Sequence, residues 1–204
     1  KKLFKSFVSI LVSLAVVAGM IYTTTPGTSR VNASIHYNLN DYAPFNSRTM
    51  KQISDMYYNA YYSLPSNYYN VAPSFAYPYD GGELSEQTLM AMTNMINLYR
   101  NLGGLSEVSI SQGSPELQAG AVIRNFDWDH FPSQSNMPSD MPQEFWDLGG
   151  NVTHNIISWN CDPVFSIYRY MNEGYETGTF TTIGHRQALY QMNTSRVDFG
   201  FADK

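Results

Sequence analysis

The chain has 204 residues, of which 43% are hydrophobic and 14% charged, and its formal net charge is −5 at pH 7. This composition excludes an intrinsically disordered chain and a polytopic membrane protein, and the length allows one domain with a sizeable core plus shorter segments. The acidic balance argues against nucleic acid and anionic lipid surfaces as partners. The single cysteine, Cys161, excludes an intrachain disulfide.

Residues 1–33 have the layout of a secretory signal peptide. Three lysines precede an apolar run from Phe7 to Tyr22, and a small-residue stretch ends at Ala33. The apolar run is shorter than the roughly 20 residues of a membrane-spanning helix, so we expect cleavage after Ala33 rather than an uncleaved membrane anchor. Cleavage would remove four basic residues and no acidic one, lowering the net charge from −5 to −9. Export without disulfides fits a secreted or cell-envelope protein of a bacterium.

Residues 34–83 form a Tyr-, Asn-, Ser- and Pro-rich extension, and ten of the 16 tyrosines lie between residues 35 and 79. Helical spacing predicts a short amphipathic helix whose buried face contains Met50, Ile53, Tyr57, Tyr61 and Leu64. Asn46 or Ser47 is the expected N-cap, and Pro65 follows the helix. Two interpretations of the tyrosines stay open. They bind sugar rings, or they pack the extension onto the main domain.

The turn PYDGGE at Pro78–Glu83 is the expected boundary of a domain spanning residues 84–204. The first helix after it is predicted from an apolar face and ends at the glycines of NLGGL. A second helix has Ser114 as its N-cap and Pro115 at its first position. A third begins near Pro163 in DPVFSIYRYMNEGY. The alternation of Val197, Phe199 and Phe201 predicts a half-buried strand at Arg196–Ala202, just after a short helix in RQALYQM.

Three separated segments of this domain resemble the CAP superfamily, also called SCP domains, which comprises the cysteine-rich secretory, antigen 5 and pathogenesis-related proteins. The segments are INLYRNLGGLSEVSISQGSPELQAGAVIRNFDWDHFP, SIYRYMNEGY and GHRQALYQMNTSRVDFGFA. The resemblance covers roughly Leu84 to the end. It implies an α+β fold, an α-β-α sandwich with a short antiparallel sheet between helices. Family domains usually continue with another strand after VDFGFA, which would make this sequence a C-terminally truncated form.

The resemblance also implies a set of site residues, because the family gathers two histidines and two acidic residues in a central groove. His130 of WDHFP and His185 of GHR match the two histidines, and Glu173 of YMNE matches one acid. The second acid is missing. Either GGNV is the equivalent turn, with Gly150 in the acid's place, or THNI is, with His154 there. In the second case His154 would complete a site of three histidines and one carboxylate.

This residue set is also chemically consistent without the family. Histidine titrates nearest physiological pH and is the commonest metal ligand, and two imidazoles with one carboxylate form a known three-ligand zinc arrangement. His130 and His185 are therefore the expected metal ligands, with zinc or another divalent cation as the cofactor that the residues suggest. No HExxH pair is present, so sequence spacing alone defines no metal motif.

The function expected from these observations is an exported CAP-like protein, more a binding protein than an enzyme. Its His/Glu groove would take a small hydrophobic or lipid-like ligand, because the resemblance implies sterols, fatty acids or similar molecules. One alternative is a metal-assisted hydrolase in which His130 and His185 hold zinc and Glu173 is the general base. Another is an envelope or host-surface interaction protein that binds through its Tyr-rich extension. The missing second acid favours binding over catalysis.

Overall fold

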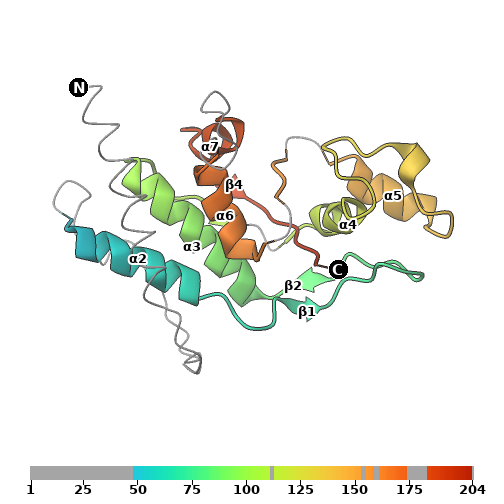
Figure 1. The fold of residues 1–204 in the computed structure, drawn as a ribbon, viewed down its shortest axis with the longest axis horizontal. Coiled ribbons are helices and arrows are strands. Elements are labelled where there is room, and N and C mark those ends of the chain that lie inside the picture. Colours follow the sequence, from blue (N-terminus) through green and yellow to red (C-terminus); the bar gives the residue numbers. More distant parts are fainter. Residues whose placement is uncertain (1–47, 111–112, 153–154, 159–160, 174–182, 204) are drawn as a thin grey trace.

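The computed structural model describes residues 48–110, 113–152, 155–158, 161–173 and 183–203, and these form a mixed α+β fold (Figure 1). Its elements in chain order are α2 (Met50–Tyr62), β1 (Tyr69–Val71), β2 (Glu83–Leu84), α3 (Glu86–Leu102), β3 (Ser109–Ile110), α4 (Pro115–Ile123), the 3₁₀ turn η3 (Gln134–Asn136), α5 (Gln143–Gly150), α6 (Pro163–Met171), α7 (Gly184–Leu189) and β4 (Arg196–Val197). None of the helices in these ranges has the length and apolar character that a bilayer crossing requires. The predicted signal peptide lies outside the described residues.

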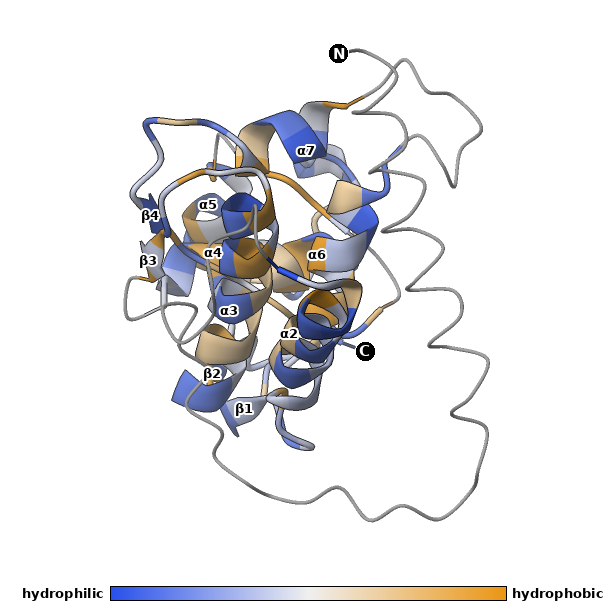
Figure 2. Cartoon of the chain, turned by 90° about the vertical axis from the view of Figure 1, so that its left-hand side faces the viewer, coloured by the Kyte–Doolittle hydropathy of each residue, from blue (hydrophilic) through white to orange (hydrophobic). Residues whose placement is uncertain are grey.

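Helix α3 is the centre of the main core and packs against α2 on one side and α6 on the other (Figure 1). Its N-cap Ser85 accepts the N–H of Thr88, and the helix ends at Gly103, so the predicted glycine stop is confirmed. The apolar residues of α3 that this core buries are Leu89, Met92, Met95, Ile96 and Tyr99. Each such side chain contributes about 1.5–3 kcal/mol through burial. Figure 2 shows apolar segments on α4 and α6 and a largely hydrophilic α7.

Helix α2, from the Tyr-rich extension, belongs to the same core. Met56 and Ala60 are fully buried there, whereas the predicted core residue Met50 is exposed. The N-cap is Thr49, not Asn46 or Ser47. Thr49 and Gln52 form a capping box, in which each side chain bonds to the backbone of the other residue. The two cap residues predicted from the sequence lie outside the described residues.

Two small sheets are present among the described residues. Strand β1, from the extension, pairs with β2 in antiparallel fashion, so the chain on the two sides of the predicted boundary is hydrogen-bonded together. Strand β4 pairs with β3, but in parallel, and the predicted antiparallel partner is not found there. The physical reason is the connection: helices α4 to α7 lie between β3 and β4 in the chain, and a crossover of this kind is what parallel pairing requires.

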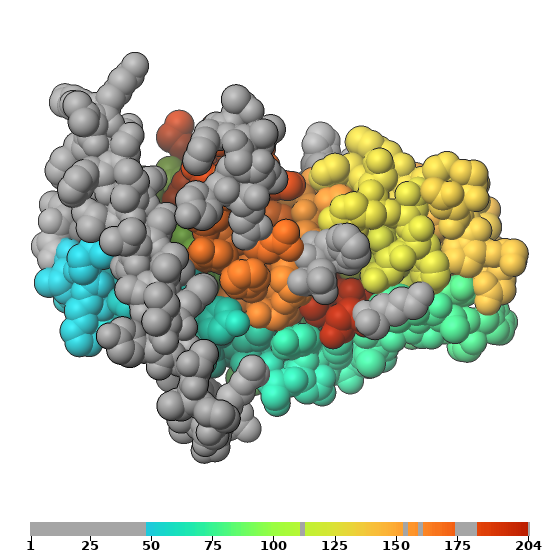
Figure 3. Space-filling model, in the orientation of Figure 1, coloured from blue at the N-terminus to red at the C-terminus, as the bar shows by residue number. Residues whose placement is uncertain are grey.

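Strand β4 is also shorter than the predicted Arg196–Ala202. Beyond Val197 the backbone is satisfied by side chains rather than by a neighbouring strand, since the N–H of Phe201 donates to Gln118 Oε1 at 2.6 Å. Figure 3 shows these C-terminal residues (red) reaching the surface beside α6 and the segment that contains β1. The predicted alternation is only partly reflected in burial: Phe199 is buried, whereas Phe201 is partly buried.

Helix α4 is approached very closely by two other backbone segments, and glycines make this possible. Its start matches the sequence prediction, with Ser114 as N-cap and Pro115 at the first position. A Cβ at Gly149 would lie 2.3 Å from Gly120 N, and one at Gly200 would lie 2.0 Å from Leu117 O. No side chain fits at either position without moving the backbone. The contacts place the end of α5 and the C-terminal segment against α4.

Candidate functional site

Glu173 and His185 are in direct contact. Glu173 follows the last turn of α6, and His185 lies in the first turn of α7. The Oε1 atom of Glu173 is 3.1 Å from His185 Nδ1, and its Oε2 atom accepts the backbone N–H of His185 at 2.8 Å. The side chain of Ile183, the residue before α7, provides no cap. The carboxylate therefore caps this helix from a distance and orients the ring at the same time.

Burial governs the protonation of His185. The pKa of its ring is lowered from the ordinary value, first by burial, while the charge of Glu173 acts in the opposite direction. The charge of His130 lowers it further, so the two predicted histidines are close enough to interact electrostatically. The Tyr170 ring packs beside the imidazole, with the ring centroids 5.0 Å apart. At neutral pH the His185 ring is therefore neutral, with its Nδ1–H directed at Glu173.

His130 is held in an equivalent way by a different partner. It lies in the loop after α4, and its Nδ1 atom is 2.7 Å from Asn155 Oδ1. The amide of Asn155 has a defined orientation because its Nδ2 donates to Val152 O at 2.7 Å. An amide oxygen only accepts, so His130 Nδ1 carries the proton. The backbone of His130 is fixed as well, since its carbonyl accepts from the buried Arg124 at 3.0 Å.

Both rings thus donate from Nδ1 to an oxygen, and within the described residues neither Nε2 atom has a hydrogen-bond partner. A metal-binding histidine is usually held in this way. However, within the described ranges no group of three or more His, Cys, Asp and Glu residues is arranged to hold a metal ion. His154, the fourth predicted site residue, lies outside those ranges. The described residues therefore supply two imidazoles but not the three protein ligands of a catalytic zinc site.

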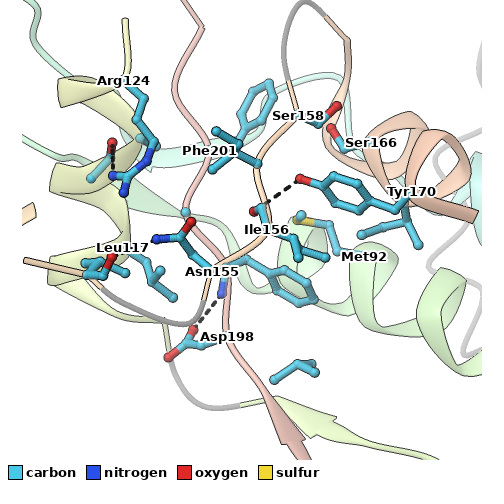
Figure 4. A pocket seen from close by; sticks show the side chains of 18 of the residues that line it. Met92, Leu117, Arg124, Asn155, Ile156, Ser158, Ser166, Tyr170, Asp198 and Phe201 are labelled. Atoms are coloured by element: carbon cyan, nitrogen blue, oxygen red, sulfur yellow. Dashed lines mark hydrogen bonds between the residues drawn. The ribbon is translucent and has the colours of Figure 1, made fainter. Parts of the chain in front are cut away.

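A cavity of about 1240 Å³ lies next to this cluster, between α3, α4, α6 and the C-terminal segment (Figure 4). His130, Glu173 and His185 do not line it, but Asn155 and Tyr170 do, and these two side chains contact the two histidines directly. Its wall is mixed and slightly more apolar than polar. The apolar residues labelled in Figure 4 are Met92, Leu117, Ile156 and Phe201. The cavity is somewhat larger than the roughly 300–1,000 Å³ of a typical small-molecule site, and charged side chains such as Arg196 and Asp198 also line it.

Three residues important for this arrangement were not identified from the sequence: Arg124, Asn155 and Tyr170. Arg124 is buried and joins α4, α5 and the His130 loop, because it donates to the carbonyls of Gly120 and His130 and lies 3.4 Å from that of Gly149. The sequence gives no sign of this role, because the burial of Arg124 is visible only in the structure. Asn155 and Tyr170 have no local signal, because their contacts join segments far apart in the chain.

Comparison with known proteins gives no assignment: no family model, no curated protein and no solved structure matches this chain.

Proposed function

We propose that this protein is an exported CAP-like binding protein whose cavity takes a small hydrophobic ligand. The observation that carries the proposal is the position of the cavity. Its wall contains Asn155 and Tyr170, which hold the two histidines matched by the resemblance. A ligand in the cavity would therefore lie one side chain away from the His/Glu cluster. The apolar part of the wall would supply burial energy, and its many polar groups would supply orientation.

The contacts of Glu173 favour binding over hydrolysis. A general base must present a free carboxylate oxygen to the proton that it removes. Both oxygens of Glu173 are engaged by His185 instead, one by the ring and one by the backbone N–H. Glu173 is thus suited to orienting His185. The metal-assisted hydrolase suggested by the sequence also lacks a third metal ligand among the described residues.

The ligand proposal is tested with fluorescent probes on the full chain. We expect cis-parinaric acid, a fatty acid, or dehydroergosterol, a sterol, to gain fluorescence with the wild-type protein. Ala121 lines the cavity, so Ala121→Phe should fill part of it and weaken binding at least about tenfold. Ala76→Phe is the matched control, because Ala76 is exposed and is not part of the cavity wall. Absence of binding, or equal binding by both variants, would refute the proposal.

A calorimetric titration with zinc distinguishes the metal-assisted hydrolase from the binding protein. If the wild type binds zinc tightly and His130→Ala/His185→Ala does not, the hydrolase gains support. The affinity of the wild-type protein for zinc should then fall as the pH drops through the range in which histidine titrates, because protons compete with zinc for the same nitrogens. If neither protein binds zinc, the cluster is a structural support for the cavity wall, as the contacts of Asn155 and Tyr170 indicate.

A further inference from the structure

Two stretches of consecutive residues border the cavity. All of residues 196–203, at the C-terminal end, and all of residues 155–158, in the loop before α6, line it. Side chains of an extended chain point alternately to opposite faces, so a cavity meets every residue in turn where the edge of the backbone borders it. Figure 4 shows both stretches as extended ribbons, one continuing from β4 past Asp198 to Phe201 and the other carrying Ile156. Main-chain N–H and C=O groups therefore border the cavity together with side chains.

One edge of the C-terminal segment is already hydrogen-bonded. The carbonyl of Ser195 accepts the N–H of Ser109, which belongs to β3, at 2.9 Å. The N–H groups of Phe201 and Asp203 donate to side-chain oxygens at 2.6 and 3.2 Å. These positions of the segment are odd-numbered, and in a strand the N–H and C=O groups of alternate residues point to the same edge. The bonds therefore belong to a single edge, the one that faces β3.

The opposite edge is open. It contains Asp198, Gly200 and Ala202, and within the described residues none of their backbone N–H groups has a hydrogen-bond partner. A bond from Asn125 Nδ2 to the carbonyl of Ala202 is long, at 3.4 Å. The backbone N–H groups of residues 155–158 have no partner in the described ranges either. Donors two residues apart, about 6.6 Å along an extended chain, form the array that another β-strand matches.

The rest of the cavity suits the side chains of such a strand. Met92 and Ile96 of α3 and Ile167 of α6 are buried and line the same cavity. A strand lying along the open edge would direct every second side chain towards this apolar floor. The volume of about 1240 Å³ exceeds that of most small-molecule sites but leaves room for several residues of extended chain. A wall that mixes polar and apolar groups is also what recognition of a peptide main chain requires.

We propose that the cavity binds a short extended peptide with alternating apolar side chains, supplied by another polypeptide, which pairs in β fashion with the open edge at Asp198, Gly200 and Ala202. This inference rests on the proposed function, since it uses the same cavity, and it names the class of ligand. Main-chain hydrogen bonds would supply affinity, and the apolar floor would supply specificity. The net charge of −5 makes two copies of the chain repel each other, which favours a different polypeptide over a second copy.

The test is amide hydrogen exchange, measured by NMR on the full chain with and without the peptide acetyl-Lys-Val-Thr-Val-Thr-Val-Lys-amide. Exchange at Asp198, Gly200 and Ala202 should slow at least about tenfold when the peptide binds. Exchange at Phe201 should change little, because its N–H is already bonded to Gln118. The same peptide with N-methylated valines is the control ligand. It loses three donors and should bind at least about tenfold more weakly.

A pair of variants tests the open edge itself. Ala202→Pro removes one of its N–H groups and should weaken peptide binding about threefold to tenfold. Ala202→Gly keeps the N–H group and should bind as the wild type does. Circular dichroism and urea midpoints would show whether both variants are folded, and the exchange pattern of the wild type does not depend on them.

The outcomes separate this inference from the proposed function. If cis-parinaric acid binds and the peptide neither binds nor displaces it, the peptide inference is wrong and the proposed function stands. If the peptide and both lipid probes fail to bind, both are wrong. Peptide binding without alternating protection, or with equal affinity for Ala202→Pro and Ala202→Gly, would also overturn the inference. A concentration-dependent dimer with the same protection pattern and no peptide would overturn it in favour of a strand exchanged between two copies.

Discussion

Replacing Arg100 with methionine should strongly destabilise the fold. The Arg100 side chain is 1% exposed and donates only to backbone carbonyls in the described structure. One acceptor is Ser106 O, just after α3. The other three, Leu189 O, Gln191 O and Thr194 O, lie at the end of α7 and in the turn that leads to β4. A single guanidinium thus joins α3 to the segment that carries His185.

The magnitude follows from the groups left without a donor. Methionine fills a similar volume but donates no hydrogen bond, and each buried carbonyl that loses its partner costs about 1–3 kcal/mol. Relief of the burial of the charge, which lowers the pKa of Arg100, offsets part of this. We expect a net loss of about 3–5 kcal/mol, a large part of the total stability of a protein of this size. Arg100→Lys should lose less, because an ammonium group still reaches some of the carbonyls.

The assay is urea unfolding followed by far-UV circular dichroism. Lys51→Met is the control, since it removes an exposed cation whose salt bridge to Asp55 should contribute less than about 1 kcal/mol. If the free energy of unfolding of Arg100→Met lies within about 1 kcal/mol of the wild-type value, the four carbonyls have found other donors. The expected destabilisation would then be wrong. A large change in the slope of the transition would instead indicate an altered unfolded state.

Three further predictions concern packing, protonation and export. Gly149→Ala should cost about 2 kcal/mol or more, because its Cβ would lie 2.3 Å from Gly120 N, whereas at Gly150 the nearest atom is 3.5 Å away; similar urea midpoints for Gly149→Ala and Gly150→Ala would contradict this. Burial lowers the pKa of His185 in the folded protein below 6.5. As the pH falls, this histidine is therefore protonated at a higher pH in the unfolded chain than in the folded one. The free energy of unfolding should therefore decrease as the pH falls through 6.5, and it should decrease less steeply in His185→Gln. If the wild type and His185→Gln show parallel pH profiles, the protonation of His185 does not control this loss of stability. Protein recovered from the culture medium should begin at Ser34 by N-terminal sequencing, and recovery only from membranes with the apolar run intact would contradict cleavage.

Much of the local structure could be predicted from the sequence, because helix ends depend on residues within one turn. The Ser114 cap with Pro115, the glycine stop at Gly103 and the start of α6 at Pro163 are all as predicted. Here the side chain or the backbone freedom of one residue satisfies groups only a few positions away. The cap of α2 differs from the prediction because Thr49 and Gln52 form a capping box, a local pattern that the sequence also contains.

Only the tertiary structure decided how distant segments meet. The parallel pairing of β3 with β4 results from a crossover of four helices, and no local pattern encodes its direction. The contact of Glu173 with His185 joins residues twelve positions apart, and that of His130 with Asn155 joins residues 25 apart. The alternation at the C-terminal end specified an extended chain, but not that side chains would replace a neighbouring strand. Residue type therefore determined which groups could interact, whereas packing around α3 and α4 determined which of them do.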